Sequence, residues 1–382
     1  MSAPQIPNLK TFRGPHGSRM QRRGLPVATE EEKTSKDKII QATDQDASVS
    51  RLSAVEVGYL HDHFAKAFVV SESDRWTRRL PIINRGTYVR TTAIDELVHR
   101  FLSAEPIVKK QIISLGAGSD TRFFRLRGSG SDFSDSIIYH ELDFAANTST
   151  KISTLVQTES ISQCVPGPLE ISSDGSKLHS PMYHIHPVDL RSPFPTEDPM
   201  NPYAKPVPLD HVDVTLPTLL ISECCLVYLE AAVAEAVLDY FASLFPSGTS
   251  LGLVLYEPIN PFDSFGKMMV SNLAARGIVL QTLQAYHSLE VQKNRLRKHG
   301  FIGAAAEDVD FLWENWISAK EKERVATLEM VDEVEEWKLL AQHYCIAWGW
   351  RGKEDAVWKF WQGINDRKNP ALLDQPVHER VP

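Results

Sequence analysis

Cysteines and long apolar runs are both scarce in this sequence. Its 382 residues include four cysteines, none in a C-x-x-C pair, which are too few to stabilise a chain of this length as a disulfide framework. A membrane helix needs about 20 consecutive apolar residues, and no segment approaches that length. The N-terminus also lacks the apolar core of a secretory signal. We therefore expect a protein of a reducing, cytoplasmic compartment with no membrane partner.

An excess of positive charge is missing too. The net charge is −8, which is unfavourable for a protein that coats a nucleic-acid backbone. No internal repeat is visible, which disfavours a solenoid or a propeller. We expect a monomer without a nucleic-acid partner, whose substrate is held by local charge.

The first 29 residues differ in composition from the rest. They contain several prolines and glycines, no acidic residue, and the basic residues Lys10, Arg13, Arg19, Arg22 and Arg23. The charge is like that of a transit peptide, but the prolines would disrupt the amphipathic helix that such a peptide needs. We expect a disordered tail over residues 1–45, with a targeting or docking segment as the alternative, and a second tail over residues 366–382.

From about residue 75, short apolar runs alternate with amphipathic segments. This alternation is typical of a parallel sheet covered by helices on both faces, and we expect one enlarged domain over residues 46–365. The expected strands are Gln111–Leu115, Ile137–Leu142, His184–Val188, Thr218–Ser222, Ser250–Tyr256, Phe301–Ala306 and Tyr344–Trp350. The expected helices are Thr91–Leu102, Ala231–Phe245, Asp263–Arg276, Leu289–His299 and Lys320–Leu340.

Acidic residues directly follow three of the expected strands. They are Asp143, Asp189 and Glu223. Ligands of an open parallel sheet bind outside the carboxyl ends of its strands. We therefore expect these three side chains to converge on one crevice.

The strand that ends at Leu115 leads into a glycine turn, Gly116-Ala117-Gly118. Glycine permits unusual backbone dihedrals and the close approach of a ligand. A dinucleotide site would place a third glycine where this chain has Thr121, so that alternative is weakened. Asp143, after the next strand, lies where a carboxylate accepts hydrogen bonds from ribose. The pattern indicates an adenosine pocket, and a purely structural turn with a solvated acid is the alternative.

Several ordered blocks extend this pattern along the chain. They are Val57-Gly58-Tyr59, Pro81 to Gly86, Leu115 to Thr121, Pro217 to Cys224, Leu226 to Leu229, Tyr256-Glu257, Phe265-Gly266 and His343 to Cys345. Together they resemble the leucine carboxyl methyltransferase family, in its fungal form, from about residue 46 to residue 350.

The resemblance implies the α/β fold of class I S-adenosylmethionine-dependent methyltransferases. That fold has a seven-stranded, mostly parallel sheet whose last strand is antiparallel, with helices on both faces. In this chain it implies a helical cap over residues 46–105 and a cofactor-binding core over 110–260. A helical insertion on the substrate side over 261–300 and terminal strands and helix over 301–350 would complete the methyltransferase domain.

The resemblance also implies a set of site residues. S-adenosylmethionine would be bound by Arg51, Arg85, Gly116, Gly118, Asp143, Asp189, Leu190 and Glu223. Asp143 would bind the ribose, while Asp189 and Leu190 would border the adenine. Glu223 would face the methionine end of the cofactor. Arg51 and Arg85 would hold carboxylates; many family members have lysine where this chain has Arg51, so the charge is kept.

Two residues would act closest to the reaction. Arg85 is expected to position a carboxylate of the cofactor, of the substrate or of both, because a guanidinium matches two carboxylate oxygens. Tyr228 would line the substrate channel, with core packing as its alternative. No metal is expected, since His184 and His186 share a strand face but no third ligand follows at a recognisable spacing.

The implied activity is methyl transfer to the α-carboxylate of the C-terminal leucine of a type 2A protein phosphatase catalytic subunit. Such a carboxylate is ionised at neutral pH, so the reaction needs no general base, and the sequence shows no obvious catalytic triad. One alternative is another carboxyl methyltransferase that acts on a small molecule or a modified tRNA. Another is a non-catalytic protein that binds the phosphatase.

Overall fold

One sheet organises the part of the chain that the computed structural model describes, which comprises residues 30–69, 78–128, 134–192, 194–198, 200, 205–332, 334–352, 355–362 and 364. Its strands are β1 (Lys110–Leu115), β2 (Ile137–Asp143), β3 (Glu170–Ile171), β4 (Leu178–His179), β5 (Tyr183–Pro187), β6 (Thr218–Glu223), β7 (Leu251–Pro258), β8 (Gly303–Asp308) and β9 (Tyr344–Arg351). The predictions for residues 1–29 and for the C-terminal tail fall outside the described residues.

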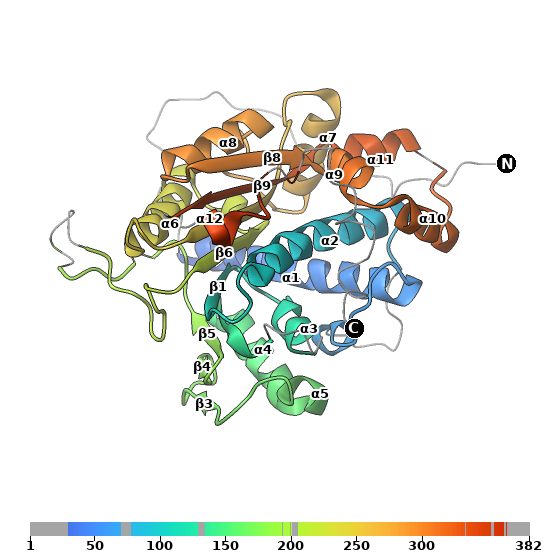
Figure 1. The fold of residues 1–382 in the computed structure, drawn as a ribbon. Coiled ribbons are helices and arrows are strands. Elements are labelled where there is room, and N and C mark those ends of the chain that lie inside the picture. Colours follow the sequence, from blue (N-terminus) through green and yellow to red (C-terminus); the bar gives the residue numbers. More distant parts are fainter. Residues whose placement is uncertain are drawn as a thin grey trace.

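The helices of the described residues surround this sheet (Figure 1). They are α1 (Glu30–Val57), α2 (Pro81–Ser103), α3 (Arg122–Gly128), α4 (Ala145–Gln157), α5 (Glu159–Ser162), α6 (Ala231–Leu244), α7 (Ser264–Ala275), α8 (Leu289–Lys298), α9 (Val309–Trp316), α10 (Ala319–Leu328), α11 (Val334–Ala341) and α12 (Asp355–Trp358). None of these helices combines the length and the apolar character that crossing a membrane would require.

The strand order is β3-β4-β5-β2-β1-β6-β7-β9-β8. Strands β5, β2, β1, β6 and β7 pair in parallel, whereas β9 is antiparallel to both β7 and β8. These strands are the seven that were predicted, and they confirm the class I methyltransferase fold. The sheet also carries a short antiparallel extension, β3 and β4, beside β5. These two strands were not predicted, because a strand of two residues is too short to show an alternation of apolar and polar residues.

Side chains of β1 alternate between two hydrophobic cores. Ile112 contributes to the core that also contains residues of α2, α4, α9 and α11, and Ile113 contributes to the core that also contains residues of α6 and α8. Both side chains are fully buried, and burial of one such side chain stabilises the fold by about 1.5–3 kcal/mol. Because both faces are covered, the functional residues lie at the ends of the strands.

One tail prediction and two helix predictions differ from the structure. Helix α1 begins at Glu30, so the tail predicted over residues 1–45 is too long. Helix α2 begins at Pro81, ten residues before the predicted start, because proline suits the first helical position. The helix predicted over Lys320–Leu340 is two helices, α10 and α11. They are separated at Glu329, whose buried carboxylate is held by Arg78 and by the 2.8 Å hydrogen bond from Asn84 Nδ2.

Candidate functional site

A cavity of about 400 Å³ opens at the carboxyl ends of the central strands. Its lining includes the expected residues Arg51, Gly116, Gly118, Asp143, Asp189, Leu190, Glu223 and Tyr228. The prediction that Asp143, Asp189 and Glu223 converge on one crevice is therefore confirmed. Helices α1 and α2 contribute the facing wall, with residues such as Asp44 and Arg90.

The glycine turn follows β1 and forms part of the cavity wall. Gly116 has a φ of 66° and Gly118 a φ of 45°, in the left-handed region that side chains rarely adopt. A Cβ atom on Gly116 would lie 2.5 Å from Cys225 Sγ, and one on Gly118 would collide with the Asp44 carboxylate. Both backbone conformation and space therefore require glycine at these two positions.

Asp143 is tied to this turn. Its Oδ2 accepts a hydrogen bond from Gly118 N at 2.7 Å, while its Oδ1 accepts from Phe144 N at 2.7 Å and from Asn147 Nδ2 at 2.9 Å. Burial raises the pKa of Asp143, and the Gly118 and Phe144 N–H groups offset part of that rise. The carboxylate is thus fixed against the glycine turn, at the place where an adenosine ribose is expected.

Asp189 and Leu190 line the cavity beyond β5. Asp189 Oδ1 accepts hydrogen bonds from Arg191 N and Nε, both at 2.9 Å. Burial opposes ionisation of Asp189, but the Arg191 hydrogen bonds outweigh it and lower its pKa. Arg191 also binds Asp37 of α1, at 2.5 and 2.9 Å, so the adenine side of the predicted pocket is joined to the N-terminal helix.

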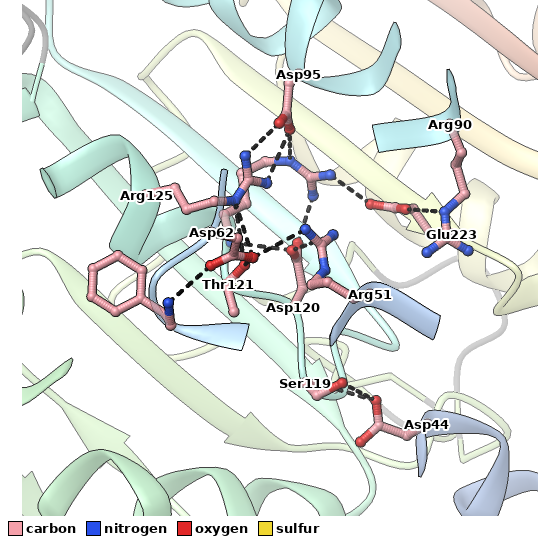
Figure 2. Close-up of polar contacts among 12 residues, drawn as sticks. Asp44, Arg51, Asp62, Arg90, Asp95, Ser119, Asp120, Thr121, Arg125 and Glu223 are labelled. Atoms are coloured by element: carbon pink, nitrogen blue, oxygen red, sulfur yellow. Dashed lines mark hydrogen bonds and ion pairs between the residues drawn. The ribbon is translucent and has the colours of Figure 1, made fainter. Parts of the chain in front are cut away.

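Glu223 is held by two arginines at the end of β6. Its Oε1 lies 2.7 Å from Arg122 Nη2 and its Oε2 lies 3.5 Å from Arg90 Nε. Figure 2 shows the contact between Glu223 and Arg90. The residue that follows, Cys224, has a φ of 48°, which is uncommon for a residue with a side chain. Such backbone strain often occurs at functional sites. Strand β6 therefore ends in a tight turn, and the Glu223 side chain at its end lines the cavity.

Arg51 belongs to a buried ion network beside the cavity (Figure 2). Its guanidinium lies 3.2 Å from Asp62 Oδ2 and 3.7 Å from Asp120 Oδ1. In the same network Asp95 contacts Arg122, at 2.9 Å from its Nε, and Arg125. Arg51 thus lines the cavity but already has anionic partners, which makes it a poorer candidate for a free carboxylate.

Arg85 lies behind the cavity wall rather than among its lining residues. Its Cζ lies 4.8 Å from the ring centroid of Trp313 and 5.3 Å from that of Trp337, which does line the cavity. Within the described residues no carboxylate forms an ion pair with Arg85, and its buried Nε has no hydrogen-bond partner. Burial lowers its pKa. Arg85 therefore retains the donors that a ligand's carboxylate would need.

Helices α1 and α2 supply cavity-lining residues that were not predicted from the sequence. Those of α1 include Ile40, Thr43, Asp44 and Ala47, beside the predicted Arg51, and those of α2 are Ile83, Gly86, Thr87 and Arg90. Both sets follow the i, i+3, i+4, i+7 spacing of one helix face. This spacing could have indicated that one face of each helix is buried. The cavity-facing sides of α1 and α2 are too polar, however, to be recognised from the sequence as buried faces.

The charge of the cavity suits a cationic ligand that also bears a carboxylate. Among the described residues, six carboxylates line it, those of Asp44, Asp46, Asp120, Asp143, Asp189 and Glu223. Three guanidiniums line it, those of Arg51, Arg90 and Arg191. Together with the glycine turn, this donor set fits S-adenosylmethionine, which has ribose hydroxyls, a sulfonium and an amino-acid end.

Comparisons with known proteins show the family of this chain. The family model described as leucine carboxyl methyltransferase matches residues 39–242. A protein of Aspergillus fumigatus named leucine carboxyl methyltransferase 1 is 54% identical, over 96% of this chain and 99% of its own length. The protein of that name from Emericella nidulans is 55% identical, over 92% and 95%. A homologue from Arabidopsis thaliana is 35% identical, over 81% and 88%.

Proposed function

Because the chain belongs to the leucine carboxyl methyltransferase family, we propose that it methylates the C-terminal leucine of a type 2A protein phosphatase catalytic subunit. The methyl group passes from S-adenosylmethionine to the α-carboxylate and the product is a methyl ester. The observation that carries this proposal is the single cavity in which Gly118 and Asp143 form an adenosine-type turn beside Glu223 and the nearby guanidiniums. The phosphatase as partner rests on the family resemblance.

The cofactor side of the proposal assigns roles to residues at the ends of three strands, β2, β5 and β6. Asp143 accepts hydrogen bonds from the ribose, Asp189 and Leu190 border the adenine, and Glu223 faces the cationic end. S-adenosylmethionine supplies, when bound, a methyl group made electrophilic by its sulfonium. The excess of carboxylates over guanidiniums in the cavity lining supports binding of such a cation.

The acceptor side of the proposal requires orientation rather than proton transfer. A C-terminal carboxylate has a reference pKa of about 3.3–3.7, so it arrives ionised and needs no base. Arg85 positions a carboxylate with its planar guanidinium, supported by its lack of an anionic partner in the described residues. Tyr228 lines the channel through which the peptide end enters. Rate enhancement then comes from alignment and from exclusion of water.

The cellular setting of the proposal is the cytoplasm, and the acting unit is a monomer. All four cysteines are free, and Cys345 is buried. Free thiols persist in a reducing compartment. The type 2A phosphatase would present its C-terminal tail to the cavity there.

The proposal is tested by mapping the methyl group. Purified phosphatase catalytic subunit is incubated with this enzyme and a cofactor labelled in its methyl group, and the product is fragmented by mass spectrometry. The label should lie on the terminal leucine, and alkali should release it as methanol, as expected of an ester. Label on an internal side chain, or label that resists alkali, would contradict the proposal.

A further inference from the structure

Five histidines gather near the outer edge of the sheet, apart from the cavity lining. They are His140 of β2, His179 of β4, His184 and His186 of β5, and His211 in the segment between β5 and β6. None of them is among the cavity-lining residues of the described chain. The methyl-transfer proposal therefore gives this cluster no role.

Three of these imidazoles converge closely enough to share one ion. One ring nitrogen from each of His179, His184 and His211 lies within 4.8 Å of the other two. The Nδ1 atoms of His179 and His184 are 3.1 Å apart. Two imidazole nitrogens bound to one tetrahedral zinc at about 2.0–2.1 Å would be separated by about 3.3 Å. The observed pair is thus close to the separation that a metal imposes.

The backbone adds a further observation. His211 has a φ of 63°, so the backbone holds this histidine in the left-handed region at a local cost.

We propose that His179, His184 and His211 form a binding site for a borderline divalent cation of the zinc class. Imidazole ligands favour zinc, nickel and copper over magnesium and calcium, which prefer oxygen. Within the described residues His186 Nε2 is engaged with His140 Nδ1 at 3.1 Å, so His186 is not counted among the ligands. The nearby charges of Lys177 and Asp210 offset each other as an ion pair.

The proposed site departs from the sequence-based expectation that this chain binds no metal. The sequence spacing places His184 and His186 on one face of a strand. His211 comes much later in the chain, and only the fold brings it close to His184. The centroids of these two rings are 4.8 Å apart. A bound ion would link β4, β5 and the segment before β6, because each of them contributes one histidine ligand. Because the unfolded chain lacks this arrangement, the ion would stabilise the folded state.

The test measures zinc binding by the full-length, tag-free chain. The protein is incubated with zinc chloride, excess metal is removed, and metal content, affinity by chelator competition and melting temperature are measured. His211→Asn is the decisive variant, because His211 is exposed and asparagine tolerates a positive φ. His63→Asn, at an exposed histidine outside the cluster, is the matched control.

We expect about one zinc ion per wild-type chain and a higher melting temperature with zinc. The His211→Asn variant should bind zinc at least about 10-fold more weakly, since even loss of an outer partner costs 10–100-fold in affinity. The His63→Asn variant should bind zinc as the wild type does. Wild-type protein without retained zinc, or equal zinc affinity in the wild type and the His211→Asn variant, would overturn the proposal.

Discussion

Asp44 of helix α1 binds the loop that follows strand β1 through Ser119. Its Oδ1 accepts hydrogen bonds from Ser119 N at 2.8 Å and from Ser119 Oγ at 2.7 Å. These contacts, which Figure 2 also shows, join the N-terminal helix to the glycine turn. Helix α1 is therefore part of the functional site and not a detachable extension of it.

Two truncations test this role of α1. Deleting residues 1–29 should leave the melting temperature and S-adenosylmethionine affinity unchanged, because the deletion ends before the helix. Deleting residues 1–45 should weaken cofactor binding, because Ile40, Thr43 and Asp44 leave the cavity wall. Isothermal titration and thermal melting give both readouts. Equal cofactor affinity of the two truncated proteins would show that α1 does not contribute to the site.

Asp143→Asn should weaken S-adenosylmethionine binding about 10- to 100-fold. A hydrogen bond to a charged group contributes about 1.5–3 kcal/mol, and the amide loses the charge. Asparagine is preferable to alanine here, because Asp143 accepts hydrogen bonds from Gly118 and Phe144 that an amide oxygen can partly replace. Titration calorimetry measures the affinity, and a melting curve checks the fold. Unchanged affinity would remove Asp143 from the site.

Arg85→Gln should lower kcat/KM by at least about 10-fold, since a charge-assisted bidentate contact is lost. Arg85→Lys should recover only part of the activity, because lysine keeps the charge but not the planar pair of donors. Arg297→Gln is the control, since that arginine is half exposed on α8 and pairs only with surface groups. Full activity of Arg85→Gln would exclude Arg85 from carboxylate positioning.

The fold could be predicted further than the site. Strands β1, β2 and β6 were found to within one residue, because buried parallel strands are short apolar runs with clear ends. The positions of the acidic residues Asp143 and Glu223 at the strand ends were predicted from these strand boundaries. Side-chain partners could not be predicted, because a guanidinium such as that of Arg122 binds carboxylates from two distant segments, Asp95 and Glu223, as well as its near neighbour Asp120.

The histidine cluster illustrates the same limit. Alternation correctly placed His184 and His186 on one face of a strand, where both are buried. Two of the neighbours of His184, His179 and His211, come from a two-residue strand and from an irregular segment. Neither has a periodic pattern, so only tertiary structure could bring the group together.

Asp95→Asn should destabilise the protein by about 3–5 kcal/mol at pH 7, because the buried Arg122 and Arg125 would lose a charged partner. Burial opposes ionisation of Asp95, but Arg125 and Arg122 outweigh it and lower its pKa. A lowered folded-state pKa contributes stability above the unfolded pKa of about 3.9, and this stability is lost as pH falls further.

Urea unfolding across pH measures this contribution of Asp95. The difference in unfolding free energy between wild type and Asp95→Asn should be constant from pH 7 to about pH 5 and should shrink below about pH 4. A difference that persists unchanged at pH 3 would show that the effect is not electrostatic.

We expect the terminal carboxylate to be the methyl acceptor, and one transfer assay with three forms of the phosphatase catalytic subunit can decide this. The forms are the intact protein, the protein without its C-terminal leucine, and the protein with that leucine amidated. Amidation removes both the negative charge and the nucleophilic oxygen, whereas a side-chain change would alter pocket binding by a few kcal/mol at most. We expect the labelled methyl group on the intact form and no label on the other two forms. Methyl transfer to the leucine-deleted or the amidated form would contradict it.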